Sequence, residues 1–147
     1  DIRNFGAITR TAECMGVHAI IIPDKGSAQI NEEAIKSSAG ALHHIPICKV
    51  SNLIETVKLL QSSGIQVCVA SEKARQLPSE TNLELPTCII LGNEEVGPSK
   101  GLMTIADYLI RLPMTGKIQS LNVGVAGAML LYECMCQRLS DQSQKPH

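Results

Sequence analysis

Aromatic side chains are scarce in this sequence, which has no Trp, two Tyr and one Phe among 147 residues. The core must therefore be aliphatic, and a platform for stacking nucleic-acid bases is excluded because it needs ring faces. An excess of charge is also lacking, since 13 Lys and Arg face 14 Asp and Glu. The sequence thus predicts no overall attraction to a polyanion, so that contact with RNA must use a local patch or residues outside this sequence.

Signals for metal binding and for membranes are lacking too. The six cysteines include no C-x-x-C pair, and Cys48, Cys68 and Cys88 lie in apolar runs, where a thiol acts as a small hydrophobic side chain. We therefore expect free thiols in a reducing cytoplasm, with neither disulfides nor a metal site. No uninterrupted apolar run approaches about 18 residues, which predicts a soluble, cytoplasmic protein without a membrane partner.

What the sequence does have is an alternation of short apolar runs with helical patterns. The expected strands are 17–23, 45–50, 65–70, 87–91 and 108–112, and the expected helices are 5–15, 31–42, 52–62, 99–105 and one after residue 120. Continuous apolar strands are typical of a parallel sheet with helices on both faces, so the predicted fold class is α/β. We expect one domain over residues 1–140 and a disordered polar tail over residues 141–147.

Two of the loops beside these strands carry polar groups suited to ligands. The first, N-F-G-A-I-T-R, puts Asn4 and Arg10 near the start of a helix, where the positive helix end favours an anionic group. The second, L-G-N-E-E-V-G-P, follows the strand 87–91, and its glycines let the backbone approach a ligand beside Glu94. A helix cap with a surface arginine, and a plain acidic turn, remain open as simpler interpretations.

A third loop lies between the strand 108–112 and the last helix. Backbone groups of Leu112, Met114 and Leu121 could hold an adenine edge, while Ser120 and Asn122 could bond a hydroxyl group. A capped core helix, with Ser120 as the cap, explains the same residues. Loops that follow the strands of one parallel sheet meet at the same edge, so the three loops together predict a ligand site there.

The three segments also resemble a known family. D-I-R-N-F-G-A-I-T-R-T-A, I-I-L-G-N-E-E-V-G and L-P-M-T-G-K-I-Q-S-L-N-V-G-V-A-G-A-M-L-L-Y-E are similar, in order and separation, to the motifs of SpoU (TrmH-like) RNA 2′-O-ribose methyltransferases of the SPOUT superfamily. The resemblance implies a C-terminal deep trefoil knot, S-adenosyl-L-methionine as methyl donor, and a homodimer packed through the knotted C-terminal region. It also implies that most of the first strand and the family's N-terminal RNA-binding extension are absent from residues 1–140.

Matched residue by residue, the resemblance assigns catalytic roles to five polar residues, Asn4, Arg10, Glu94, Ser120 and Asn122. It assigns cofactor contacts to seven residues of the strand ends and loops, Ala70, Leu91, Gly92, Asn93, Leu112, Met114 and Leu121. Asn4 is expected to orient Arg10, whose guanidinium would stabilise the charge that develops on the ribose oxygen.

The reaction implied is 2′-O-methylation of a ribose in RNA, with a guanosine of large-subunit ribosomal RNA favoured. A tRNA ribose as substrate, and a non-catalytic RNA-binding subunit of the same fold, stay open as alternatives. An ordinary nucleotide- or NAD-binding enzyme is disfavoured because the first strand–helix turn lacks the glycine fingerprint of that class.

Overall fold

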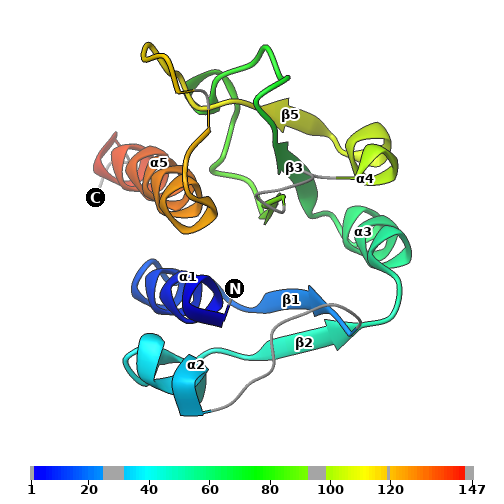
Figure 1. The fold of residues 1–147 in the computed structure, drawn as a ribbon. Helices are drawn as coiled ribbons and strands as arrows, with labels where there is room; N and C mark the ends of the chain where they lie inside the picture. The colour runs from blue at the N-terminus through cyan, green and yellow to red at the C-terminus, as the bar shows by residue number, and fades with distance from the viewer. Residues whose placement is uncertain (1, 25–31, 93–98, 119, 145–147) are drawn as a thin grey trace. The chain divides into compact units, whose positions relative to one another are not determined.

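The computed structural model describes residues 2–24, 32–92, 99–118 and 120–144 (Figure 1). The chain divides into two compact units, Asp1–Leu53 and Ile54–His147. Each unit contains parallel strands and the helices that pack on them, and each is described by itself.

The first unit has a two-stranded parallel sheet and three helical segments. Its elements are α1 (Ile2–Cys14), β1 (Ile20–Pro23), α2 (Glu32–Ser37), the 3-10 helix η1 (Ala41–His43) and β2 (Ile47–Val50). The side chains of Phe5, Thr9 and Ala12 are buried on one side of α1, at the spacing of an amphipathic helix. α1 lies close to α2 because Gly6 has no side chain, since a Cβ there would overlap the Cβ of Ser37.

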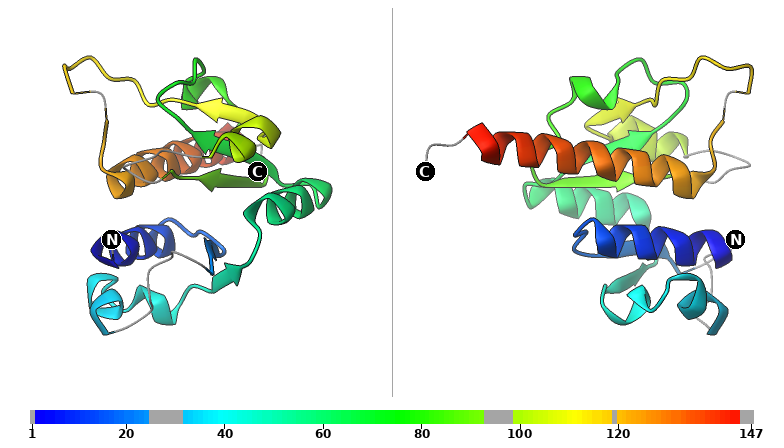
Figure 2. Two further views of the ribbon diagram at one scale, coloured as in Figure 1. Left: turned by 45° about the vertical axis from the view of Figure 1, so that its right-hand side comes forward. Right: turned by 90° about the vertical axis from the view of Figure 1, so that its left-hand side faces the viewer.

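The second unit is a three-stranded sheet with helices on both faces. Its elements are α3 (Leu53–Ser62), β3 (Gln66–Ala70), the 3-10 helix η2 (Pro78–Glu80), β4 (Thr87–Ile90), α4 (Lys100–Ile105), β5 (Tyr108–Ile110) and α5 (Val123–Gln144). All strands are parallel, in the order β4-β3-β5. α5 covers one face of this sheet, and α3 and α4 lie on the other (Figures 1 and 2). The predicted α/β class is confirmed, whereas the knot stays a prediction.

The core of the second unit forms where α5 packs on the sheet. Cys68 of β3, Ile110 of β5 and Leu130 of α5 are fully buried in one cluster. Because side chains alternate along a strand, Val67 and Val69 point to the opposite face, and both are fully buried as well. The sheet is therefore covered on both sides, as its continuous apolar strands predict.

The polar connection between β3 and β4 is bound to α5 by side-chain hydrogen bonds. The Leu83 amide donates to Oε1 of Gln137 at 2.8 Å, and Nε2 of Gln137 donates to the Thr81 carbonyl at 3.1 Å. Arg138 donates to the carbonyls of Leu83 and Leu85. These bonds hold the Leu83 side chain, which is fully buried, in the core beneath α5.

Several local predictions differ from the structure. α1 begins at Ile2, so Asn4 lies inside its first turn instead of capping it. Cys48 and its neighbour Lys49 are both exposed in the middle of β2, so this apolar run does not place the thiol in the core. α5 continues to Gln144, through part of the expected disordered tail, because no Pro or Gly interrupts it before Pro146. In the part of the chain that is described, no helix is long and apolar enough to span a membrane.

Two buried thiols make the core sensitive to alkaline pH. Burial raises the pKa of Cys68 from 9.0 to about 12, and it also raises the pKa of Cys134. Above pH 9.0 the unfolded chain therefore releases thiol protons that the folded chain retains until about pH 12. The stabilising contribution of Cys68 is complete below this range and falls by about 1.4 kcal/mol per pH unit within it.

We expect the urea midpoint of the reduced protein to fall as the pH rises above 9.0. The Cys68→Ala variant should start from a lower stability, because it leaves a small cavity, but should lose less stability over the same pH range. Cys14→Ala changes an exposed thiol and should follow the wild type. An identical pH dependence for Cys68→Ala and the wild type would contradict this account.

Candidate functional site

The carboxyl ends of β3, β4 and β5 bring three predicted cofactor residues to one face of the sheet. Ala70 ends β3, Leu91 follows β4, and Leu112 lies two residues beyond the end of β5. All three side chains are half-buried and pack against the core cluster under α5. They form an aliphatic floor at the edge of the sheet where ligands bind in open α/β folds.

The other predicted cofactor residues lie in the loops around this floor. Gly92 is half-buried next to Leu91, and Met114 is half-buried in the connection after β5. Leu121 precedes α5 and is 37% exposed, which leaves an apolar side chain accessible. Asn93 and the predicted catalytic residue Glu94 lie outside the described residues.

The start of α5 corrects one sequence prediction. Oδ1 of Asn122 accepts hydrogen bonds from the amides of Gly124 at 2.9 Å and Val125 at 3.2 Å. Asn122 is therefore the residue that caps α5, while Ser120 is exposed two residues earlier. The prediction that Ser120 caps the helix was wrong because the helix begins later than the apolar pattern indicates. Asn122 also has a structural role in addition to its predicted catalytic one.

The remaining predicted catalytic residues, Asn4 and Arg10, lie on α1 in the first unit. Asn4 is half-buried and Arg10 is exposed. Six residues along a helix correspond to about 9 Å of rise and a different face, so the helix itself does not bring the two side chains together. That these residues meet the loops of the second unit in one pocket stays a prediction.

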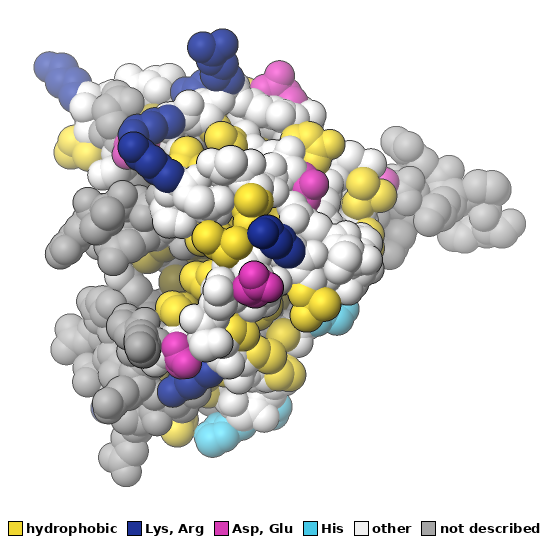
Figure 3. Space-filling view, turned by 90° about the vertical axis from the view of Figure 1, so that its right-hand side faces the viewer, with side chains coloured by type: hydrophobic (Ala, Val, Ile, Leu, Met, Phe, Trp, Pro, Cys, Tyr) yellow, Lys and Arg dark blue, Asp and Glu magenta, His cyan; other side chains and the backbone are white. Residues whose placement is uncertain are grey.

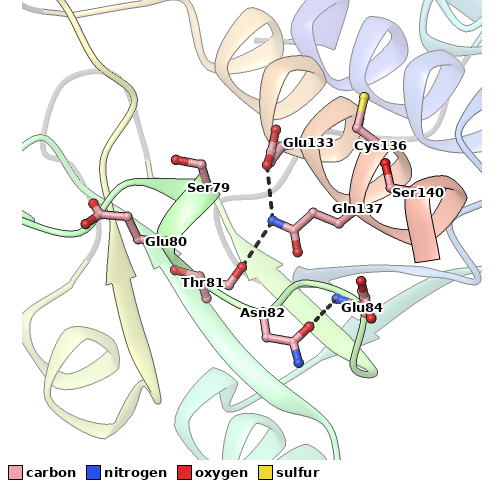
Figure 4. A pocket seen from close by; sticks show the side chains of 9 residues that line it. All are labelled: Ser79, Glu80, Thr81, Asn82, Glu84, Glu133, Cys136, Gln137 and Ser140. Atoms are coloured by element: carbon pink, nitrogen blue, oxygen red, sulfur yellow. Dashed lines mark hydrogen bonds between the residues drawn. The ribbon is translucent and has the colours of Figure 1, made fainter. Parts of the chain in front are cut away.

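A cavity of about 480 Å³ lies elsewhere on the second unit, between the connection before β4 and the C-terminal half of α5 (Figure 4). Gln137 reaches across it from α5 to the Thr81 carbonyl. Among the described residues, its lining includes the carboxylates of Glu80, Glu84 and Glu133 and no Lys or Arg. None of the predicted site residues that the structure describes lines it, and its negative side chains are unsuited to an RNA backbone.

Four cationic residues near the site were not singled out from the sequence. Lys73 and Arg75 follow β3, and Arg111 and Lys117 follow β5. Lys73 and Arg75 lie in a short run of mixed charge, and Lys117 lies within the third motif without a role assigned to it there. Gln76 pairs with Ile110, so the segment after β3 lies beside the end of β5.

Comparison with known proteins agrees with this architecture. The model of the SpoU rRNA Methylase family matches residues 1–132. The chain is 39% identical over 140 residues to the 23S rRNA (guanosine-2'-O-)-methyltransferase RlmB of Photorhabdus laumondii, a match that covers 95% of this chain and 57% of that protein.

Two solved structures are similar to this chain. One is the SpoU methyltransferase AviRb of Streptomyces viridochromogenes in complex with AdoMet, with a TM-score of 0.87, 28% identity, and coverage of 95% of this chain and 55% of that one. The other is the A. aeolicus TrmH/SpoU tRNA modifying enzyme, with a TM-score of 0.88, 32% identity, and coverage of 97% and 72%.

The chain spans between 55% and 61% of the length of the first three curated proteins it matches. The match therefore covers a larger share of this chain than of those proteins. The family match itself extends over residues 1–132 of the 147. Together with the parallel sheet and its covering helices, it shows that this chain belongs to the SpoU rRNA methylase family.

Proposed function

We propose that this chain is the catalytic part of an enzyme that methylates a ribose 2′-hydroxyl group in RNA with S-adenosylmethionine. A guanosine of large-subunit ribosomal RNA is the favoured substrate, and the cytoplasm is the expected compartment. The observation that carries the proposal is the floor of Ala70, Leu91 and Leu112 at the carboxyl ends of adjacent parallel strands. The similar protein AviRb was solved with AdoMet, and the similar protein RlmB is named for a ribosomal RNA guanosine.

The residues of the floor fit the proposed cofactor. Ala70, Leu91 and Leu112 offer half-buried aliphatic surface to an adenine ring and to a methionine chain. The backbone of residues 111–118 can supply hydrogen bonds to the adenine edge. S-Adenosylmethionine carries its methyl group on a sulfonium, which leaves as a neutral thioether when the methyl group is transferred.

Arg10 is the residue to which we assign stabilisation of the reacting oxygen. The bond from sulfur to the methyl group breaks as the bond from the ribose oxygen to the methyl group forms, and the hydroxyl proton leaves to water or to a phosphate oxygen. A guanidinium stays protonated under ordinary conditions, so Arg10 cannot take that proton. It can donate hydrogen bonds to the oxygen as negative charge develops there.

We expect Arg10→Ala to lower the rate of methyl transfer by about 100-fold or more while S-adenosylmethionine binds nearly as tightly as before. Transfer of tritiated methyl groups to ribosomal RNA measures the first effect, and calorimetry measures the second. Arg10→Lys should retain part of the activity, because it keeps the charge but loses the forked donors. Glu13→Ala, another exposed position on α1, is the control. Near-normal turnover in Arg10→Ala would rule out this role.

Gly127 controls the position of the floor. A Cβ at Gly127 would lie 2.8 Å from Cδ1 of Leu91, so α5 touches the residue next to Gly92 only because position 127 has no side chain. Gly127→Ala should displace the Leu91 side chain and weaken S-adenosylmethionine binding several-fold. Overall stability should change little, because alanine favours the helix by about 1 kcal/mol over glycine.

Gly101→Ala is the matched control for this prediction. Its Cβ would meet Cδ1 of Ile54 at 3.0 Å, which is also the flexible end of an aliphatic side chain, but on the opposite face of the sheet. Calorimetric titration should give a raised dissociation constant for Gly127→Ala alone. The assignment of the floor is wrong if both variants bind the cofactor like the wild type.

A stripe of exposed apolar side chains on α5 supports the homodimer. Val125, Met129, Tyr132 and Leu139 are 48%, 48%, 61% and 57% exposed. Their spacing of four, three and seven residues places them on one side of the helix, over about 21 Å. A second copy rotated about a twofold axis would present the same stripe, so the two surfaces can cover each other.

We expect the double variant Met129→Glu with Tyr132→Glu to be monomeric, because charge in this stripe opposes burial. Light scattering coupled to size-exclusion chromatography measures the mass. Leu59→Glu, at a residue that is 65% exposed on α3, should leave the dimer intact. A wild type that is monomeric at working concentrations would contradict the proposed dimer.

The substrate assignment can be tested directly with RNA from a strain that lacks the protein. Mapping of 2′-O-methyl groups in that RNA should reveal one lost modification, which we expect in large-subunit ribosomal RNA. The purified protein should restore it in vitro with S-adenosylmethionine. A loss confined to tRNA would reassign the substrate, and no loss in any RNA together with no binding of S-adenosylmethionine would refute the function.

A further inference from the structure

The charged side chains of the second unit are unevenly distributed. Lys73, Arg75, Arg111 and Lys117, here called the basic edge, all lie in the connections that leave the carboxyl ends of β3 and β5. Within residues 71–77 and 111–118, which are fully described, Glu72 is the single acidic residue. Seen from the side of α3 and α4, Lys and Arg side chains gather at the end of the unit where these connections lie (Figure 3).

Backbone pairing holds the two connections together. Gln76 forms an isolated parallel bridge with Ile110, and the Arg111 amide donates to the Gln76 carbonyl at 2.8 Å. The Ser71 amide donates to the Ile110 carbonyl at 2.9 Å. The connection after β3 therefore runs beside the end of β5 like a short additional strand, which brings Arg75 next to the segment of Arg111. Lys73 and Lys117 lie in the same two connections.

Strand alternation sets the direction of the two arginines. Ile110 is fully buried in the cluster under α5, so its neighbour Arg111 points to the opposite face. Arg75 precedes Gln76, which pairs with Ile110, and so Arg75 points to that same opposite face. Strand alternation therefore directs both arginine side chains away from the aliphatic floor. Arg111 is half-buried and Arg75 is exposed.

Acidic side chains lie further along the connection after β3. Nε2 of Gln76 donates to the Glu80 carbonyl at 3.1 Å, and the Leu77 amide donates to Oε1 of Glu80 at 2.8 Å, so the Glu80 carboxylate is bound to the backbone of this connection. Together with Glu84 and Glu133, Glu80 lines the cavity between the connection and α5. Because the whole chain has a net charge of −1, the four cations of the basic edge are a local concentration of positive charge.

We propose that the basic edge binds the phosphate backbone of the RNA strand that enters the site, an inference that rests on the proposed function. Arg111 points to one side of the chain, and the Leu112 side chain of the cofactor floor points to the other. An RNA backbone bound at Arg111 therefore lies beside the methyl donor. The scarcity of aromatic residues makes base stacking unavailable to this edge. Binding there depends on phosphate charge, is strongly weakened by salt, and is nearly independent of RNA sequence.

The test removes the four charges in the full-length protein by combining Lys73→Ala, Arg75→Ala, Arg111→Ala and Lys117→Ala. Binding of a short single-stranded RNA oligonucleotide of mixed sequence is measured over a range of salt concentrations. We expect the slope of log affinity against log salt to fall by about 0.7 for each charge removed, and the affinity at low salt to fall by at least about tenfold. The control combines Lys36→Ala, Lys49→Ala and Lys58→Ala, three exposed charges outside the edge.

The outcomes separate this inference from the proposed function. If the wild type methylates RNA and the quadruple variant binds RNA with the wild-type salt slope, the basic edge is refuted and the function stands. If the wild type neither binds S-adenosylmethionine nor methylates RNA, the function itself fails. Should the quadruple variant not fold, the exposed single variant Lys73→Ala decides, since it should raise KM for RNA with kcat and cofactor affinity unchanged. An unchanged KM in this variant would refute the edge.

Discussion

The packing of α5 on one face of the β4-β3-β5 sheet is the interaction on which the second unit depends. Cys68, Ile110 and Leu130 are fully buried where the helix meets the strands. With few aromatic side chains available, this core relies on close approach of aliphatic groups, and Gly127 permits it by leaving room for Leu91. The same contact positions Leu91, which belongs to the proposed cofactor floor, so core packing and the proposed cofactor site are physically coupled.

Parallel strands explain why chemistry and charge are concentrated at one edge. The carboxyl ends of all three strands of the second unit point the same way, so the chain segments that leave them meet there. Aliphatic side chains of these segments turn towards α5, and the basic edge lies beside them. In a nearly neutral chain, the four cations of the basic edge are a local concentration of positive charge that suits the proposed RNA substrate.

Elements with strong local signals were predicted well. The strands β3 and β4 lie within a residue of their predicted ends, and α4 begins after Ser99, whose hydroxyl accepts from the Leu102 amide at 3.2 Å. The sequence prediction was wrong where two nearby residues could each cap the same helix. Ser120 and Asn122 can both cap a helix, and the start of α5 is decided by how the helix packs. Leu91 and Leu112 lie within the family motifs and Ala70 lies outside them, and the role of all three in cofactor binding stays a prediction. The basic edge was not singled out from the sequence.

The sequence by itself determined the α/β class, the aliphatic core and membership of the SpoU family, because apolar periodicity and the order of motifs are properties of the linear chain. Only the tertiary structure decided that the segment of Gln76 runs beside Ile110, that Asn122 caps α5, and that Met129 and Tyr132 stay exposed. These features depend on strand register and on the rotation of a helix about its axis. Both are set by contacts between segments far apart in the sequence, which no local pattern encodes.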